Sequence, residues 1–180
     1  MKRLTLAFGM VALFLGTLPA QAGPITPGDL LVYRVGTGQA TLSSAATPVF
    51  VDEYTTAGVL VNSIPMPTAA SGTQLPLTAS GTATSEGYLN LSQNSQYLVL
   101  TGYAATPGTA SVASTTSAST PRVVARIDAN GNVDTSTNFT SAYSGNNIRS
   151  AFSTDGTTIW TSGTGSSSTG GVWTINFGAT

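Results

Sequence analysis

The sequence predicts an all-β protein, built from repeated antiparallel hairpins that form propeller-like blades in a shortened or incomplete propeller. Residues 91–102 align without a gap on residues 152–163, and each copy has an apolar residue, a polar turn, an apolar strand and a final glycine. Internal repeats spaced by tens of residues are typical of solenoids, propellers and arrays. The inner strands 98–100 and 123–125 are apolar at consecutive positions. Such strands are expected to be covered on both faces, as in a blade packed between neighbours.

A second pair of hairpins alternates with the first. Residues 49–61 and residues 122–134 each contain two strand-forming runs around a short turn that includes glycine. This pattern predicts a hairpin in each segment. In the later one, Asn130 and Gly131 predict a two-residue turn in which both residues have positive φ.

One strand is expected before these four hairpins, at residues 30–36, and a similar one after them, at residues 172–178. With two hairpins to a four-stranded blade, the chain holds about two blades and two additional strands, whereas closed propellers have four to eight blades. A ring completed by other copies is therefore possible, and a β-sandwich and a β-solenoid remain alternatives. Beyond residue 22 no segment has the apolar period of a helix.

The first 22 residues have the pattern of a secretory signal peptide. Lys2 and Arg3 precede an apolar run over residues 4–18, and the small residues Ala20 and Ala22 then occupy the positions that a signal peptidase reads. The apolar run is short for a transmembrane helix. We expect cleavage after Ala22 and export to the periplasm or the extracellular space, with residues 23–180 forming one β-domain that has no membrane span.

Composition excludes several functions. After removal of residues 1–22 the chain has four arginines against seven acidic residues, and it contains no lysine, histidine or cysteine. Nucleic acid is not expected as a partner, because binding to the phosphate backbone requires a basic surface. Ser-His-Asp and Cys-His catalysis, Schiff-base chemistry and ordinary zinc sites lack their essential residues. No metal and no other cofactor are expected.

Five blocks of the sequence carry a resemblance to known proteins, namely residues 28–36, 43–54, 81–87, 122–135 and 144–150. They resemble a family of uncharacterised exported bacterial proteins with a β-propeller-like repeat. The resemblance covers nearly all of residues 23–180, and members of the family are typically longer, with further repeats. It implies a propeller-like fold and export, and it implies no activity.

Three residues are candidates for ligand binding. Glu86 could polarise a ligand hydroxyl, Arg149 could hold an anion, and Trp160 could stack on a sugar. Each also has a structural interpretation: a hydrogen-bonded acid at a strand start, a contact between blades, and packing within a blade. No catalytic residue is predicted.

A metal site was weighed at residues 128–134, where oxygen-bearing side chains occur at alternate positions as in calcium loops. The EF-hand pattern requires Gly at the sixth position and a later Glu, whereas Val133 is sixth here, so a turn is favoured. Asp52 and Glu53 are neighbours on a predicted strand. They should point to opposite faces and cannot form a local carboxylate pair.

These observations favour a non-catalytic exported β-repeat module, with a binding or structural role at or outside the cell envelope. Its partner is unknown, and a glycan, an envelope component and another copy of the chain are all possible. The alternative is a carboxylate-dependent glycosidase or lyase acting on extracellular polysaccharide, because two acids suffice for glycoside hydrolysis.

Overall fold

The computed structural model describes residues 23–166 and 168–180, so the predicted signal peptide lies outside the described residues. Within this part of the chain, regular structure is β apart from one short 3-10 turn at Val112–Ser114. The predicted all-β class is therefore confirmed. In the same residues, no helix is long and apolar enough to cross a membrane.

All pairing between the strands is antiparallel. The strands are β1 (Leu30–Val35), β2 (Ala46–Tyr54), β3 (Leu60–Pro65), β4 (Thr78–Ser80), β5 (Asn90–Leu91), β6 (Tyr97–Tyr103), β7 (Arg122–Asp128), β8 (Val133–Phe139), β9 (Ile148–Ser153), β10 (Thr158–Gly163) and β11 (Gly171–Asn176).

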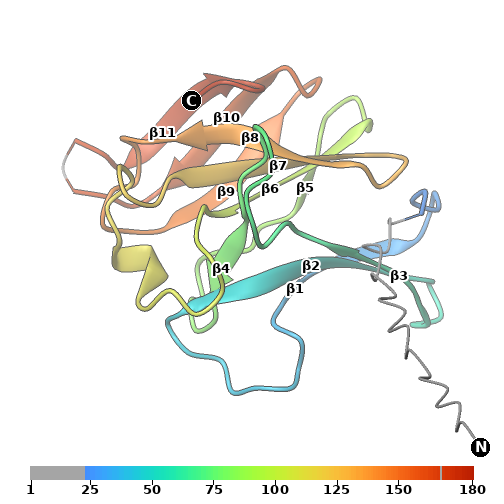
Figure 1. The fold of residues 1–180 in the computed structure, drawn as a ribbon. Helices are drawn as coiled ribbons and strands as arrows, with labels where there is room; N and C mark the ends of the chain where they lie inside the picture. The colour runs from blue at the N-terminus through green and yellow to red at the C-terminus, as the bar shows by residue number, and fades with distance from the viewer. Residues whose placement is uncertain (1–22, 167) are drawn as a thin grey trace, which may run out of the picture.

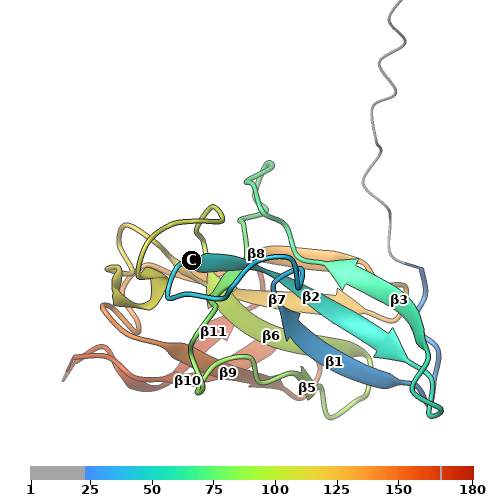
Figure 2. The same ribbon diagram turned by 90° about the horizontal axis from the view of Figure 1, so that it is seen from below.

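The strands form three layers (Figures 1 and 2). The first layer is β1–β3, the middle layer is β5–β8 and the third layer is β9–β11. The short strand β4 joins the first layer to the middle one, because it pairs with the start of β2 and with the end of β6. Neither the eight-stranded sheet made in this way nor the three-stranded sheet closes on itself among the described residues. The predicted propeller is therefore not shown by the described residues, whereas the antiparallel all-β class is.

The middle layer is apolar on both faces, as the consecutive apolar residues predict. Leu98 and Leu100 of β6 pack with Val51 and Ile64 of the first layer, in one buried cluster. Val99, between them, points the other way and packs with residues of the third layer in a second cluster. Alternate residues of a strand face opposite sides, so a run of three apolar residues supplies two cores.

The four predicted hairpins all form, as β2–β3, β5–β6, β7–β8 and β9–β10. Their grouping differs from the predicted two blades with two additional strands. The strand β6 pairs along its whole length with β7, so the β5–β6 and β7–β8 hairpins form one continuous layer. The first strand completes one outer layer with β2–β3, and the last strand completes the other with β9–β10.

The prediction for the β7–β8 turn is wrong in one respect. Gly131 has φ of +79°, but Asn130 is not among the residues with positive φ. The amide of Gly131 donates to the carbonyl of Asp128, and the amide of Asp128 donates to the carbonyl of Asn132. The loop is thus one residue longer than a two-residue turn, and a longer loop needs only its glycine in the left-handed region. Gly58 occupies the equivalent place in the β2–β3 turn, with φ of +80°.

Candidate functional site

Glu86 lies on the loop between β4 and β5, where it joins three parts of the molecule. The amide of Ser80 donates a hydrogen bond to Oε2 at 3.2 Å. The hydroxyl of Tyr103 and the side-chain amide of Asn147 both donate to Oε1. Since Asn147 immediately precedes β9, this carboxylate connects the middle layer to the third layer. Glu86 thus accepts hydrogen bonds from three donors within the fold, and ligand binding by this residue stays a prediction.

Arg122 is a buried cation that the sequence did not single out. It is fully buried, and its Cζ lies 4.8 Å from the ring centroid of Tyr103. Its terminal nitrogens donate to backbone carbonyls, at 2.7 Å to Thr120, 2.6 Å to Thr115 and 3.1 Å to Asn146. Burial lowers the pKa of this guanidinium. Arg122 therefore connects the loops around residues 113–120 and 146 to the core through hydrogen bonds. The sequence signal that could have indicated this buried cation is an arginine next to a run of apolar strand residues.

The buried surroundings of Glu86 also affect the pKa of two tyrosines, Tyr33 and Tyr103. Burial, followed by the negative charge of Glu86, raises the pKa of Tyr33 and of Tyr103 well above the ordinary tyrosine value. Both phenols therefore remain protonated. The hydroxyl of Tyr103 is consequently a hydrogen-bond donor to Glu86 and not a base.

Arg149 is the extra residue of a β-bulge. Ser150 faces Ser162 and Ile148 faces Gly163, so Arg149 has no partner in the pairing of β9 with β10. Bulges commonly redirect a side chain. Its Nε is buried without a hydrogen-bond partner, and no ion pair involves this side chain in residues 23–166 and 168–180.

Trp160 lies on the outer face of the third layer, the face turned away from the middle layer. It is opposite Phe152 of β9 and Thr174 of β11. The ring centroids of Trp160 and Phe152 are 6.5 Å apart, and both side chains are exposed. The partner strands thus present an aromatic pair on an open sheet face.

The three predicted site residues are not in direct polar contact with one another. No hydrogen bond or ion pair joins any two of Glu86, Arg149 and Trp160 within the described part of the chain. Glu86 reaches the segment before Arg149 through Asn147, whereas Trp160 belongs to the outer face. Sequence position alone could not separate an interlayer contact from an open face.

A polar pocket of about 300 Å³ lies where β6, β7 and the β7–β8 turn meet, and it includes Tyr97, Arg126 and two acids. The acids already have partners. The carboxylate of Asp128 accepts from the amides of Asn130 and Asn132, at 2.9 and 3.0 Å. Asp134 accepts from the amide of Ser136 at 2.9 Å and from Gln74 at 3.2 Å.

These hydrogen bonds also affect the ionisation of the two acids. Although partial burial opposes ionisation, the hydrogen bonds keep the pKa of Asp128 and of Asp134 below the usual range. Among the residues that the structure describes, no group of three or more potential metal-ligating side chains occurs. The geometry is that of a turn closed by its own carboxylate.

A second pocket of about 310 Å³ lies beside the first and shares Tyr97 and Asp128 with it. Its lining is mainly apolar and includes Ile25, Leu31 and Leu98. The amide of Ile25 donates to the carbonyl of Ala129 at 2.9 Å, which fixes the segment before β1 against the β7–β8 turn. This pocket thus lies between the first and middle layers.

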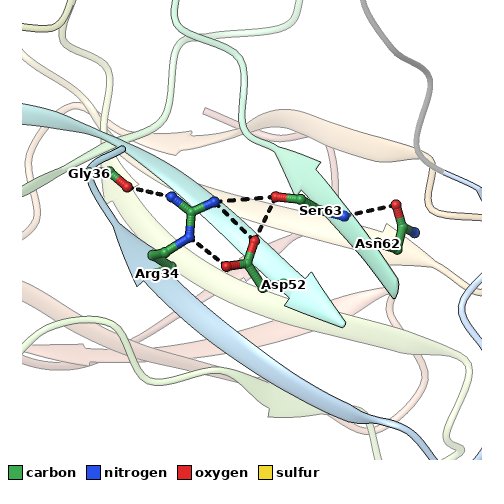
Figure 3. Close-up of polar contacts among 5 residues, drawn as sticks. All are labelled: Arg34, Gly36, Asp52, Asn62 and Ser63. Atoms are coloured by element: carbon green, nitrogen blue, oxygen red, sulfur yellow. Dashed lines mark hydrogen bonds and ion pairs between the residues drawn. The ribbon is translucent and has the colours of Figure 1, made fainter. Parts of the chain in front are cut away.

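Asp52 and Glu53 have separate partners, as their neighbouring strand positions predict. Asp52 forms a bidentate ion pair with Arg34, at 2.5 Å to Nε and 3.1 Å to a terminal nitrogen, and accepts from the hydroxyl of Ser63 at 2.6 Å (Figure 3). Glu53 instead accepts from the amide of Thr26 at 2.6 Å. The first pair neutralises its own charge on the outer face of the first layer.

Comparison with known proteins gives no match: none of the family models, curated proteins and solved structures compared with the chain matches it significantly. The resemblance to exported repeat proteins therefore stays a prediction.

Proposed function

We propose that the chain is a non-catalytic exported β-repeat module, with a binding or structural role at or outside the cell envelope. The observation that carries this proposal is the contrast between its buried and its exposed faces. The middle layer is covered on both sides, whereas the outer face of the third layer exposes Phe152, Trp160 and Val172. Exposed apolar sheet faces are typical of interaction surfaces.

In this proposal the three layers are successive blades of an incomplete propeller. Two features support the interpretation. The β2–β3 and β7–β8 hairpins have a glycine of positive φ at the same place, and each has a shift of register near it. The β5–β6 and β9–β10 turns lie side by side, because the amides of Gln93 and Asn94 donate to the carbonyls of Ser153 and Thr154.

The polar groups support a non-catalytic role. Glu86 accepts hydrogen bonds from three donors, Asp128 accepts from amides of its own turn, and Asp134 accepts from Ser136 and Gln74. Each of these carboxylates thus has hydrogen-bond partners within the fold. A glycan microarray tests for binding, and a hydrolysis screen on polysaccharides tests for catalysis. In the microarray, Trp160→Ala removes the exposed aromatic residue of the third layer, and Tyr88→Ala, at another exposed aromatic residue, is its matched control. Glycan turnover that Glu86→Gln abolishes would favour the glycosidase or lyase alternative.

Export rests on the pattern of residues 1–22 and has its own test. The chain is expressed with this segment, and the exported protein is analysed by intact mass spectrometry. We expect the polypeptide to begin at Gly23. Exported protein that begins at Met1 would contradict the predicted cleavage.

A further inference from the structure

Within residues 23–166 and 168–180, no further layer covers the two sheet faces at the ends of the three-layer stack (Figure 1). On the outer face of the first layer, strand alternation places Leu30, Val32 and Leu60, each about half exposed. On the outer face of the third layer it places Trp160 and Val172, which are 37% and 74% exposed. Each end therefore presents apolar side chains on a sheet rather than on a loop.

The regular outward strand positions of both end faces carry no unpaired charge, and the one charged residue of β9, Arg149, lies in the bulge. The outward positions of the third layer are occupied by Ser, Thr, Asn and apolar residues around Trp160. The one ion pair on the first layer, between Arg34 and Asp52, is internally compensated. A strongly charged partner would therefore find no complementary group at these regular positions, whereas the desolvation of another neutral sheet would cost little free energy.

The molecule itself shows what covers such a face. The first layer packs on one side of the middle layer and the third layer on the other, each through a fully buried apolar cluster. The stack thus grows in one direction, from the first layer to the third. In another copy of the chain, the first layer also has an open outer face. That first layer could therefore continue the stack by packing on the third layer of this copy.

We propose that a second copy of this chain is the partner, with the third layer of each copy packed on the first layer of the other. The two contacts are equivalent and close a two-fold ring. Three layers from each of two copies fall within the four to eight blades of closed propellers. This inference rests on the proposed repeat module and names its partner.

The test measures molecular mass by sedimentation of the exported protein, with Trp160→Glu on one face and Val32→Arg on the other. We expect the wild type to have twice the mass of a single chain. Each variant alone should dissociate, with a dimerisation constant weakened by ~100-fold or more, because a buried unpaired charge then lies in both contacts. Tyr88→Glu, at a 58% exposed position outside both faces, should leave the dimer intact.

Mixing the two variants distinguishes this arrangement from a symmetric contact of like faces. Trp160→Glu retains an intact first-layer face, and Val32→Arg retains an intact third-layer face, so the mixture should regain a two-chain species. A dimer in which like faces meet would instead survive in one of the variants alone. Val172→Glu and Leu30→Arg repeat the experiment at more exposed positions, and thermal melts confirm that each variant is folded.

A monomeric wild type would overturn the inference, and so would a single variant that remains dimeric or a mixture that stays monomeric. These results differ from a failure of the proposed function. A monomer that binds glycan through Trp160 would refute the pairing but retain a binding module. Polysaccharide turnover by an assembled dimer would refute the non-catalytic role alone.

Discussion

The guanidinium carbon of Arg126 lies 3.3 Å from the ring centroid of Phe177, so a cation of the middle layer is packed on the residue that follows β11. The same carbon lies 4.4 Å from the ring centroid of Tyr97, and a terminal nitrogen donates to the carbonyl of Gly156 at 2.9 Å. Arg126 therefore joins the middle and third layers through the ring of Phe177 and the hydrogen bond to Gly156, while the ring of Tyr97 belongs to its own layer.

This arrangement predicts that the charge of Arg126 contributes to stability. Arg126→Met keeps the aliphatic packing and removes the cation, and it should lower the free energy of unfolding by about 1–2 kcal/mol, the scale of a partly desolvated cation–π contact. Arg126→Lys should recover only part of the loss, because an ammonium cannot stack as a planar guanidinium does. Urea denaturation measures both. Equal stability of Arg126→Met and the wild type would contradict the role.

Gly156, whose carbonyl accepts the hydrogen bond from Arg126, has φ of +83°. A Cβ at this position would overlap the ring of Tyr97, whereas Gly108, with φ of +90°, has open space around its Cβ direction. Both Gly→Ala substitutions are strained by their backbone. We expect Gly156→Ala to cost about 1–3 kcal/mol more than Gly108→Ala, which is the usual penalty of overpacking. Equal costs in thermal melts would show that the Tyr97 ring moves aside freely.

We expect the β7–β8 turn to depend on Gly131, which has φ of +79°, and not on a bound metal. Gly131→Val should destabilise the protein by more than ~1 kcal/mol, because a β-branched residue resists positive φ. Asp128→Asn should cost less than ~1 kcal/mol, since an amide oxygen can still accept from the turn amides.

Thermal melts of these variants with calcium and with chelator provide the check. The melting temperature of the wild type should be the same in both. A calcium-dependent rise that disappears in Asp128→Asn would instead establish a metal site at this turn.

The Arg34–Asp52 pair predicts a contribution to acid sensitivity. Asp52 is 2% exposed, and although burial opposes its ionisation, hydrogen bonds from Arg34 and Ser63 lower its pKa below the usual value. A carboxylate with a lowered folded-state pKa stabilises the fold above its unfolded pKa of about 4, and this contribution is lost as the pH falls through the folded value.

Asp52→Asn should therefore be about 1–3 kcal/mol less stable than the wild type at neutral pH, and the difference should shrink below pH of about 4. Denaturant unfolding across the pH range measures it. Asp29→Asn removes the same charge at a residue whose carboxylate has no hydrogen bond or ion pair in the described part of the chain, and it should show a smaller effect. A difference that is constant with pH would assign the cost to packing.

The sequence by itself determined the β class, the four hairpins and the two-sided burial of β6 and β7. These properties are local, because strand period, turn glycines and consecutive apolar residues act within a few positions of one another. The separation of Asp52 from Glu53 followed from the same alternation. The exact turn at Asn130 did not, since loop length depends on the register that the paired strands adopt.

Only the tertiary structure decided how the hairpins combine and where the polar residues lie. The pairing of β6 with β7, and of the first and last strands with the outer layers, depends on contacts between segments far apart in the sequence. The hydrogen bonds of Glu86 and Arg122 depend on packing, which brings Tyr103 and Asn147 to the first and backbone carbonyls to the second. Trp160 remained exposed because no layer of the described chain covers its sheet, and that is a property of the fold and not of any local pattern.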